Sequence, residues 1–217
     1  MSKVCQSHAG ETAALKIGIT GGIGSGKTTI CKIFETLSIP VYYADERAKF
    51  LMANDVALKA KIKSLLGEAA YVDGKTLNRD FIAGIVFSDA RKLEALNTLV
   101  HPAVGEDYAQ WHAAQSQVPY TLKEAALLFE SNGAKMLDKT IVVHAPVQLR
   151  IERVMARDGV SETAVRNRMD KQMDDGQKRK LADFVILNDG EHPLIPQVVR
   201  LHEQLLQIAQ HKSGERP

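Results

Sequence analysis

The sequence predicts an α/β protein with a mostly parallel five-stranded sheet that is covered by helices on both faces. Five apolar runs of strand length recur along the 217 residues, and helical patterns lie between them. The runs lack strict apolar/polar alternation, which is typical of strands buried on both faces of a sheet. Parallel strands need long crossover connections, and the intervals here are long enough. The five runs are 15–20, 39–44, 118–125, 139–145 and 183–188.

Composition sets the class of the chain. Hydrophobic residues make up 45% of it and the net charge is +2, so it can bury a full core and has no global charge excess of the kind that binds nucleic acid. No apolar stretch has the length of a membrane span, and the N-terminus lacks the apolar segment of a signal peptide. Cys5 and Cys31 lack metal-ligand spacing. We therefore expect a cytoplasmic protein with no nucleic-acid, membrane or obligate protein partner.

A glycine-rich segment follows the first apolar run and precedes a helical pattern. It matches G-x-x-x-x-G-K-[ST], the P-loop pattern, in which glycines let backbone N–H groups approach phosphate oxygens. The lysine reaches the β/γ-phosphates, the threonine hydroxyl ligates Mg²⁺, and the following helix directs its positive end at the same phosphates. This predicts a site for ATP and Mg²⁺, with Thr28 on the metal, formed by Gly22, Ile23, Gly24, Ser25, Gly26, Lys27, Thr28 and Thr29.

The acceptor of the phosphoryl group must be inferred from other residues. Neither the N-K-x-D motif of GTPases nor the L-S-G-G-Q motif of transporter ATPases occurs, which favours a small-molecule kinase. Asp45 ends the second apolar run, where a carboxylate at the ligand edge of the sheet could accept the proton of an attacking hydroxyl. The alternative is that Asp45 caps a helix starting at Glu46. The residues alone leave both interpretations open.

Three further polar residues have both a functional and a structural interpretation. Glu124 follows the third apolar run and could hold Mg²⁺ through water, whereas Glu130 is better explained as a solvated helix end. His101 could contact substrate, but a solvated histidine is the simpler interpretation. His101 lies in a long helical pattern, within a region inserted between the second and third runs. Pro102 predicts a break or kink in that pattern.

The region after the fourth run predicts a helix, a short turn and a second helix capped by Ser161. Lys and Arg outnumber Asp and Glu in it, and Arg150, Arg153 and Arg157 recur at helical spacing on one face. An arginine stripe that closes over a nucleotide could neutralise charge on the transferring phosphoryl group. An ordinary solvated face would show the same spacing.

An ordered series of motifs resembles the dephospho-CoA kinase family from about residue 16 to about residue 190. The glycine-rich motif alone is generic, but the series in this order is specific. The matching segments are GITGGIGSGKTT (18–29), ADERAK (44–49), LNRDFIAGIVFSD (77–89), LVHPAV (99–104), ALLFES (126–131), RVMARDGVSETAVRNRMDKQ (153–172) and ADFVILND (182–189).

The resemblance implies transfer of the ATP γ-phosphoryl group to the ribose 3′-hydroxyl of dephospho-CoA, giving CoA and ADP. It implies a three-layer P-loop kinase fold with a helical CoA-binding insertion and a helical lid. The expected parts are a polar tail (1–14) and one kinase domain (15–217), divided into a core (15–45, 116–146 and 181–217), an insertion (46–115) and a lid (147–180).

The resemblance also assigns roles to individual residues. Asp45 becomes the catalytic base beside Lys27, with Arg153 and Arg157 as lid contacts to phosphate. Asn188 becomes a contact on the adenine side of ATP. The substrate-binding residues would be Asp45, Arg47, Arg79, His101 and Glu124.

Three positions depart from the family pattern. Tyr43 stands where an aspartate is usual, Ala126 replaces a proline, and Arg150 stands where glutamine is common. Because Tyr43 replaces that aspartate, Asp45 is the only candidate base of the pair found in the family. Two other functions stay open: another P-loop kinase for a small molecule or a nucleoside monophosphate, and a nucleotide-gated binding protein.

Overall fold

The computed structural model describes residues 14–214 and has a five-stranded sheet at its centre, in the order β2-β5-β1-β6-β7. Every neighbouring pair in this sheet is parallel, which confirms the predicted sheet. Strands β2 and β5 each begin two residues later than predicted because Pro40 and Pro119 precede them and have no N–H to donate. The strands are β1 (Leu15–Thr20), β2 (Val41–Tyr43), β5 (Tyr120–Glu124), β6 (Lys139–His144) and β7 (Phe184–Leu187).

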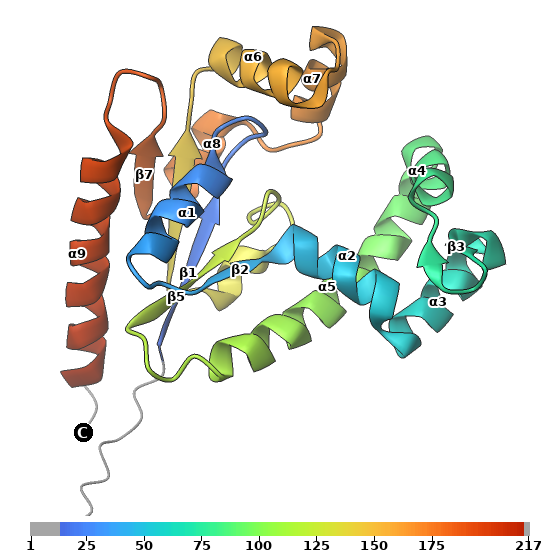
Figure 1. The fold of residues 1–217 in the computed structure, drawn as a ribbon, viewed down its shortest axis with the longest axis horizontal. Coiled ribbons are helices and arrows are strands. Elements are labelled where there is room, and N and C mark those ends of the chain that lie inside the picture. The colour runs from blue at the N-terminus through green and yellow to red at the C-terminus, as the bar shows by residue number, and fades with distance from the viewer. Residues whose placement is uncertain (1–13, 215–217) are drawn as a thin grey trace, which may run out of the picture.

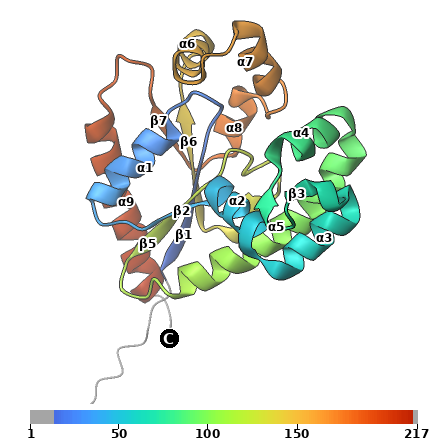
Figure 2. The same cartoon turned by 45° about the vertical axis from the view of Figure 1, so that its right-hand side comes forward.

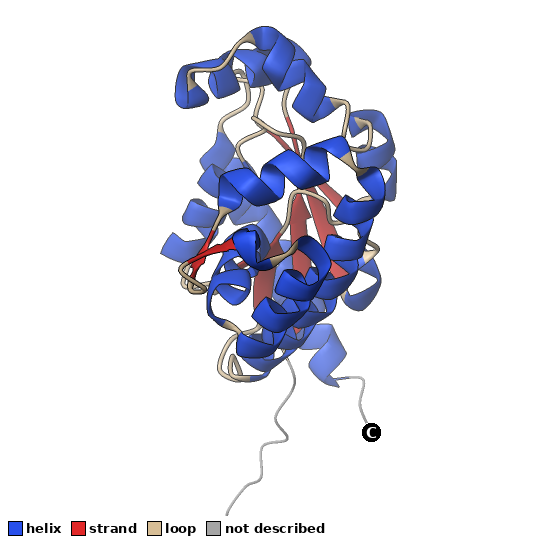
Figure 3. Cartoon of the chain, turned by 90° about the vertical axis from the view of Figure 1, so that its right-hand side faces the viewer, coloured by secondary structure: helices blue, strands red, loops and turns tan. Residues whose placement is uncertain are grey.

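The main hydrophobic core lies between this sheet and two helices, α1 (Lys27–Thr36) and α9 (Leu194–Gly214). β1 runs through the middle of the sheet, and its Ile17 and Ile19 are fully buried. Helix α1 adds Ile30 and Phe34, which lie one helical turn apart on its buried face. Figure 1 shows α1 and α9 side by side along the sheet, and Figure 3 shows the strands enclosed by helices.

The chain between β2 and β5 forms a second, mainly helical unit with its own hydrophobic cluster. Its aromatic members Tyr42, Tyr108 and Trp111 contact one another. Figure 2 shows this unit gathered beside the sheet. Its elements are α2 (Ala44–Asn54), α3 (Val56–Leu66), a 3₁₀ turn (Glu68–Ala70), the hairpin strands β3 (Tyr71–Val72) and β4 (Thr76–Leu77), α4 (Arg79–Ser88) and α5 (Ala90–Ala113).

Of the break or kink predicted at Pro102, the break does not occur in α5. The helix continues through it for its full length. Leu96, Val100, Val104 and Tyr108 are buried on one face, before and after the proline. Packing of this face offsets the missing backbone hydrogen bond, which costs about 3 kcal/mol in an isolated helix.

The predicted helix-turn-helix after β6 is present as α6 (Val147–Asp158) and α7 (Glu162–Met169). The Ser161 hydroxyl accepts a hydrogen bond from the Ala164 N–H at 3.3 Å, as expected of an N-cap. The two helices share a small cluster formed by Ile151, Val154 and Val165. A third helix, α8 (Asp175–Leu181), was not predicted. It is short and polar, so its sequence lacks the apolar periodicity that indicates a helix. A 3₁₀ turn (Gly133–Met136) completes the elements.

The N-terminal tail predicted over 1–14 lies outside the described residues except for Ala14, which is buried and leads directly into β1. Cys5 also lies outside them. None of the helices within residues 14–214 has both the length and the apolar character needed to span a bilayer.

Candidate active site

The P-loop joins β1 to α1 at the carboxyl end of the sheet, and it requires glycine at several positions, as Gly24 and Gly26 show. Gly24 has φ +79°, and a Cβ there would lie 2.5 Å from the backbone carbonyl oxygen of Arg150. Gly26 has φ +91°, and the Asn188 amide fills the space of its Cβ. Both residues adopt a conformation that L side chains avoid, and both are closely approached by distant parts of the chain. The loop therefore holds a fixed shape.

Two segments far along the sequence bond to the backbone of this loop. The Ile23 N–H donates to the Gln172 side-chain oxygen at 2.9 Å, and the Asn188 amide donates to the Ser25 carbonyl at 2.8 Å. The Ser25 hydroxyl is buried and has no hydrogen-bond partner among the described residues. A buried, unpaired hydroxyl inside a glycine loop at a helix N-terminus suits the oxygens of a phosphate group.

Lys27 is the first residue of α1, and its side chain folds back over the loop. Its ammonium donates to the Gly21 carbonyl at 2.9 Å. Burial lowers the pKa of Lys27, and the carboxylates of Glu124 and Asp45 oppose that effect. The carboxylates of Glu124 and Asp45 are therefore near enough to act on the charge of Lys27. Thr28 and Thr29 follow Lys27 and are exposed.

Glu124 and Asp45 differ in their surroundings. Glu124 ends β5 and is only 7% exposed, and burial raises its pKa to about 7. Asp45 is exposed in the first turn of α2. It neither ends a strand nor caps a helix, because β2 stops at Tyr43 and α2 begins at Ala44 with Tyr43 as its N-cap. The capping interpretation of Asp45 is therefore wrong.

The predicted lid arginines have different partners. Arg153 donates to the backbone carbonyl of Asn188 at 3.1 Å and to its side-chain oxygen at 3.2 Å, so it is linked through Asn188 to the P-loop. Arg157 is 63% exposed and donates to Asp158 at the end of α6. Arg150 is buried, so a solvated face does not describe it. The structure thus brings Arg153 to the site and directs Arg157 to a neighbouring carboxylate.

Glu130 is not a solvated helix end, contrary to the sequence interpretation. Its carboxylate pairs at 2.9 Å with Lys178, whose side chain is fully buried, and accepts the Met173 N–H at 2.8 Å. Lys178 also donates to the Ala126 carbonyl at 3.3 Å. A buried ion pair of this kind, with additional hydrogen bonds, fixes the segment that leads into α8.

The predicted substrate residues of the helical unit are spread over it. Arg47 donates to Asp107 at 2.9 Å, and Asp107 also accepts the Tyr42 hydroxyl at 2.7 Å. Arg79 is exposed at the start of α4, which Figure 1 shows at the far end of this unit from α1. Partial desolvation and the nearby Lys123 ammonium lower the pKa of His101 on α5. Of Arg47, Arg79 and His101, only Arg47 forms an ion pair within the described residues, and its partner is Asp107.

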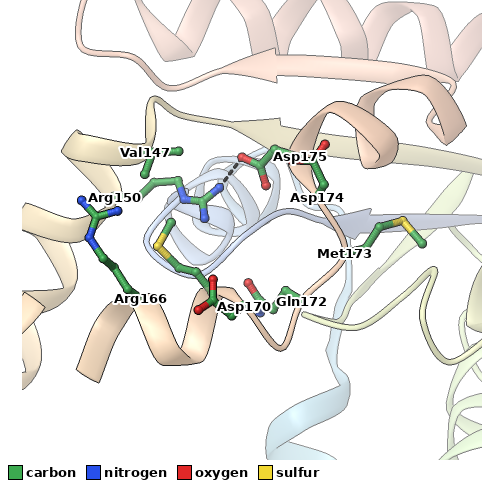
Figure 4. A pocket seen from close by; sticks show the side chains of 9 residues that line it. Val147, Arg150, Arg166, Asp170, Gln172, Met173, Asp174 and Asp175 are labelled. Carbon is green, nitrogen blue, oxygen red and sulfur yellow. Dashed lines mark hydrogen bonds and ion pairs between the residues drawn. The ribbon is translucent and has the colours of Figure 1, made fainter. Parts of the chain in front are cut away.

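A cavity of about 370 Å³ lies beside the P-loop, between α6, α7 and the segment leading into α8. Figure 4 shows charged side chains from all three segments around it. Sequence reasoning missed most of this lining because it comes from residues that share no motif or period. The lining includes Val147, Arg150, Arg166, Gln172, Asp174 and Asp175.

A glycine loop with Lys27 folded over it, acidic side chains near that lysine and an arginine of α6 linked to the loop define a P-loop kinase of the small-molecule class. A family model described as dephospho-CoA kinase matches residues 15–193. The chain belongs to the dephospho-CoA kinase family.

Individual relatives agree with this assignment. The dephospho-CoA kinase of Bacteroides fragilis is 39% identical over 188 residues, which cover 87% of this chain and 91% of that protein. The Salinibacter ruber enzyme of the same name is 45% identical over 176 residues, covering 80% of this chain and 88% of that protein.

Solved structures show the same fold. The Thermus thermophilus protein TT1252 is 35% identical with a TM-score of 0.77, covering 89% of this chain and 97% of that one. The dephospho-CoA kinase from Campylobacter jejuni is 26% identical with a TM-score of 0.67, covering 88% and 97%. Shikimate kinase from Acinetobacter baumannii, at 15% identity and a TM-score of 0.54, shares the fold.

Proposed function

We propose that this protein transfers the γ-phosphoryl group of ATP to the ribose 3′-hydroxyl of dephospho-CoA, giving CoA and ADP in the cytoplasm. The observation that carries the proposal is the Lys27 ammonium, which donates to the P-loop carbonyl of Gly21 and whose pKa responds to the nearby carboxylates of Glu124 and Asp45. This arrangement sets a phosphate-binding cation beside a candidate base. Membership of the dephospho-CoA kinase family supports the choice of acceptor.

The chain's own residues would divide the work as follows. The P-loop backbone and Lys27 bind the phosphates and stabilise the charge that builds up on them during transfer. Asp45, exposed at the start of α2, accepts the proton of the attacking hydroxyl. Arg153, held by Asn188, is placed on the lid side to add positive charge near the P-loop.

Oxygen donors at the site are of the type that Mg²⁺ prefers, namely the Thr28 hydroxyl at the start of α1 and nearby carboxylates. When bound, Mg²⁺ would neutralise phosphate charge. The roles proposed for Asn188 at the adenine and for Arg157, Arg47, Arg79, His101 and Glu124 towards substrates stay predictions.

An ADP-release assay with ATP and Mg²⁺ tests the choice of acceptor when dephospho-CoA is offered in parallel with AMP, CMP and shikimate. We expect ADP release with dephospho-CoA and a product that is heavier by one phosphate in the mass spectrum. The same reaction without any acceptor is the control for ATP hydrolysis. Phosphorylation of shikimate or of a nucleotide in place of dephospho-CoA would refute the proposed acceptor while leaving the P-loop kinase class intact.

A further inference from the structure

Arg150 on α6 is the lid arginine that lies against the P-loop. Its side chain is only 5% exposed. The guanidinium atoms lie 2.5–2.7 Å from where a Cβ of Gly22 would be, so they contact the loop through the space that this glycine leaves. The Arg150 backbone packs in the same way on Gly24. A buried cation is thus in contact with the segment that the motif assigns to phosphate binding.

The hydrogen bonds of this guanidinium leave donors available. Arg150 pairs with the carboxylate of Asp175 at the start of α8. Its Nε is buried and has no hydrogen-bond partner among the described residues. A guanidinium has five N–H donors, and Nε together with one terminal nitrogen forms a fork that fits two oxygens of a phosphate. An unpaired buried donor costs free energy that a phosphate oxygen would recover.

The 370 Å³ cavity provides space next to this guanidinium. In Figure 4 the Arg150 side chain reaches across the cavity towards Asp175, whereas the Arg166 side chain points away from Asp175. Arg166 lines the same cavity but pairs with Glu162 on its own helix and is half exposed. Arg150 therefore differs from Arg166 in burial, in direction and in its contact with the loop.

We propose that Arg150 binds phosphate groups of the donor nucleotide and that Asp175, which holds the guanidinium in an ion pair, releases it when they bind. This inference rests on the proposed function because it takes ATP as the donor. Asp175 is 19% exposed, so its carboxylate remains accessible to water when the phosphates take over the guanidinium. The competing interpretation is a purely structural clamp in which the pair joins α6 to α8.

Nucleotide binding by the full chain separates the two interpretations. Calorimetric titration with ATP and Mg²⁺ would compare the wild-type protein with Arg150→Gln, Asp175→Asn and, as the matched control, Arg166→Gln. We expect Arg150→Gln to raise the Kd for ATP about tenfold, which is typical of losing one hydrogen bond to a charged group. Asp175→Asn should bind ATP at least as tightly as wild type, because it frees the guanidinium, and Arg166→Gln should be unchanged.

The clamp interpretation predicts that Arg150→Gln and Asp175→Asn both weaken ATP binding, and that result would overturn the proposal. Wild-type affinity for ATP in Arg150→Gln would also overturn it. So would an equal loss of affinity for adenosine, measured by competition, because adenosine has no phosphate. Glutamine keeps a polar side chain of similar shape at this position without the charge, and thermal unfolding checks that the variant folds. Arg150→Lys, with an intermediate Kd expected, provides a second variant.

These binding results are independent of the acceptor. If wild type fails to phosphorylate dephospho-CoA but Arg150→Gln still shows the selective loss of ATP affinity, the proposed function fails and the role of Arg150 stands. If wild type phosphorylates dephospho-CoA and Arg150→Gln binds ATP normally, the proposed function stands and the role of Arg150 fails.

Discussion

The P-loop and the helical unit between β2 and β5 differ in where their polar contacts come from. Ile23 and Ser25 in the loop bond to side chains that are 149 and 163 residues further along the chain. Arg47 of the helical unit and Tyr42 of β2 share Asp107 on α5, within a span of 65 residues. The loop is thus fixed by segments near the end of the chain, whereas Asp107 has partners that are closer in the sequence.

This difference has a consequence for ligand binding. Near the loop, the Ser25 hydroxyl and the Arg150 Nε are buried without a partner among the described residues, so they remain available to a ligand. Around Asp107, Arg47 already holds a carboxylate and would have to exchange it in order to bind substrate. Unpaired polar atoms are therefore present beside the loop, whereas Arg47 would first have to leave Asp107. Four substitutions test this contrast.

Lys27→Ala should have the largest effect. Loss of the ammonium that lies over the loop should reduce kcat/KM by about a thousandfold, the upper range for removing one group that stabilises transition-state charge. Steady-state kinetics with ATP measure this. Lys32→Ala is the matched control, since Lys32 lies on the same helix, 64% exposed and paired with Glu35. Full activity in Lys27→Ala would remove the lysine from the mechanism.

Asp45→Asn should reduce kcat by about a hundredfold, the typical loss for a general base, and leave the Kd for ATP unchanged. Single-turnover kinetics and a separate ATP titration provide the two readouts. Glu46→Gln, at the neighbouring exposed position in α2, is the control. A change in ATP affinity without a change in kcat would show that Asp45 belongs to the donor side instead.

Glu124→Gln should change how stability depends on pH. Burial raises the Glu124 pKa from its ordinary value of 4.5 to about 7, so folding favours the protonated form. The wild-type free energy of unfolding should therefore fall as the pH rises from 4.5 to 7 and then level off, by about 2–3 kcal/mol. Glu124→Gln should lack this fall. Denaturant unfolding at pH 5 and pH 8 measures it, and parallel curves for both proteins would contradict the burial argument.

Asp107→Asn should have the smallest effect, a loss of about 1–2 kcal/mol in the free energy of unfolding, because Arg47 is partly exposed and loses only part of its interaction. The hydrogen bonds from Arg47 lower the Asp107 pKa, so this stabilisation is present above the ordinary pKa of 3.8 and is lost as the pH falls through the folded value. Glu106→Gln, at an exposed neighbouring position, is the control. An equal loss in both variants would exclude a specific role for the pair.

Local patterns in the sequence were sufficient for the sheet, the glycine loop and the cap at Ser161. Each of these is encoded within a few residues by apolar runs, by required glycines or by a hydroxyl before a helix. The sequence correctly placed Asp45 at the carboxyl end of the sheet. The prediction that it ends a strand was wrong, because the strand is short and the helix starts without a side-chain cap.

Contacts between distant segments could not be predicted in this way. The pairing of Glu130 with Lys178 joins residues 48 apart in number, and Gln172 meets Ile23 across most of the chain. No periodicity reports such partners, because side chains that meet only in the folded protein leave no local pattern. Arg150 and Arg157 share a helix spacing, yet the fold buries the first and exposes the second.

The position of the phosphate added to dephospho-CoA tests the central claim most directly. Phosphorus NMR of the product formed from ATP by the full chain, compared with authentic CoA, identifies that position. The account predicts a single new monophosphate on the ribose 3′-hydroxyl, in amounts equal to the ADP released. A phosphate at another hydroxyl, or ADP release without any phosphorylated dephospho-CoA, would contradict it.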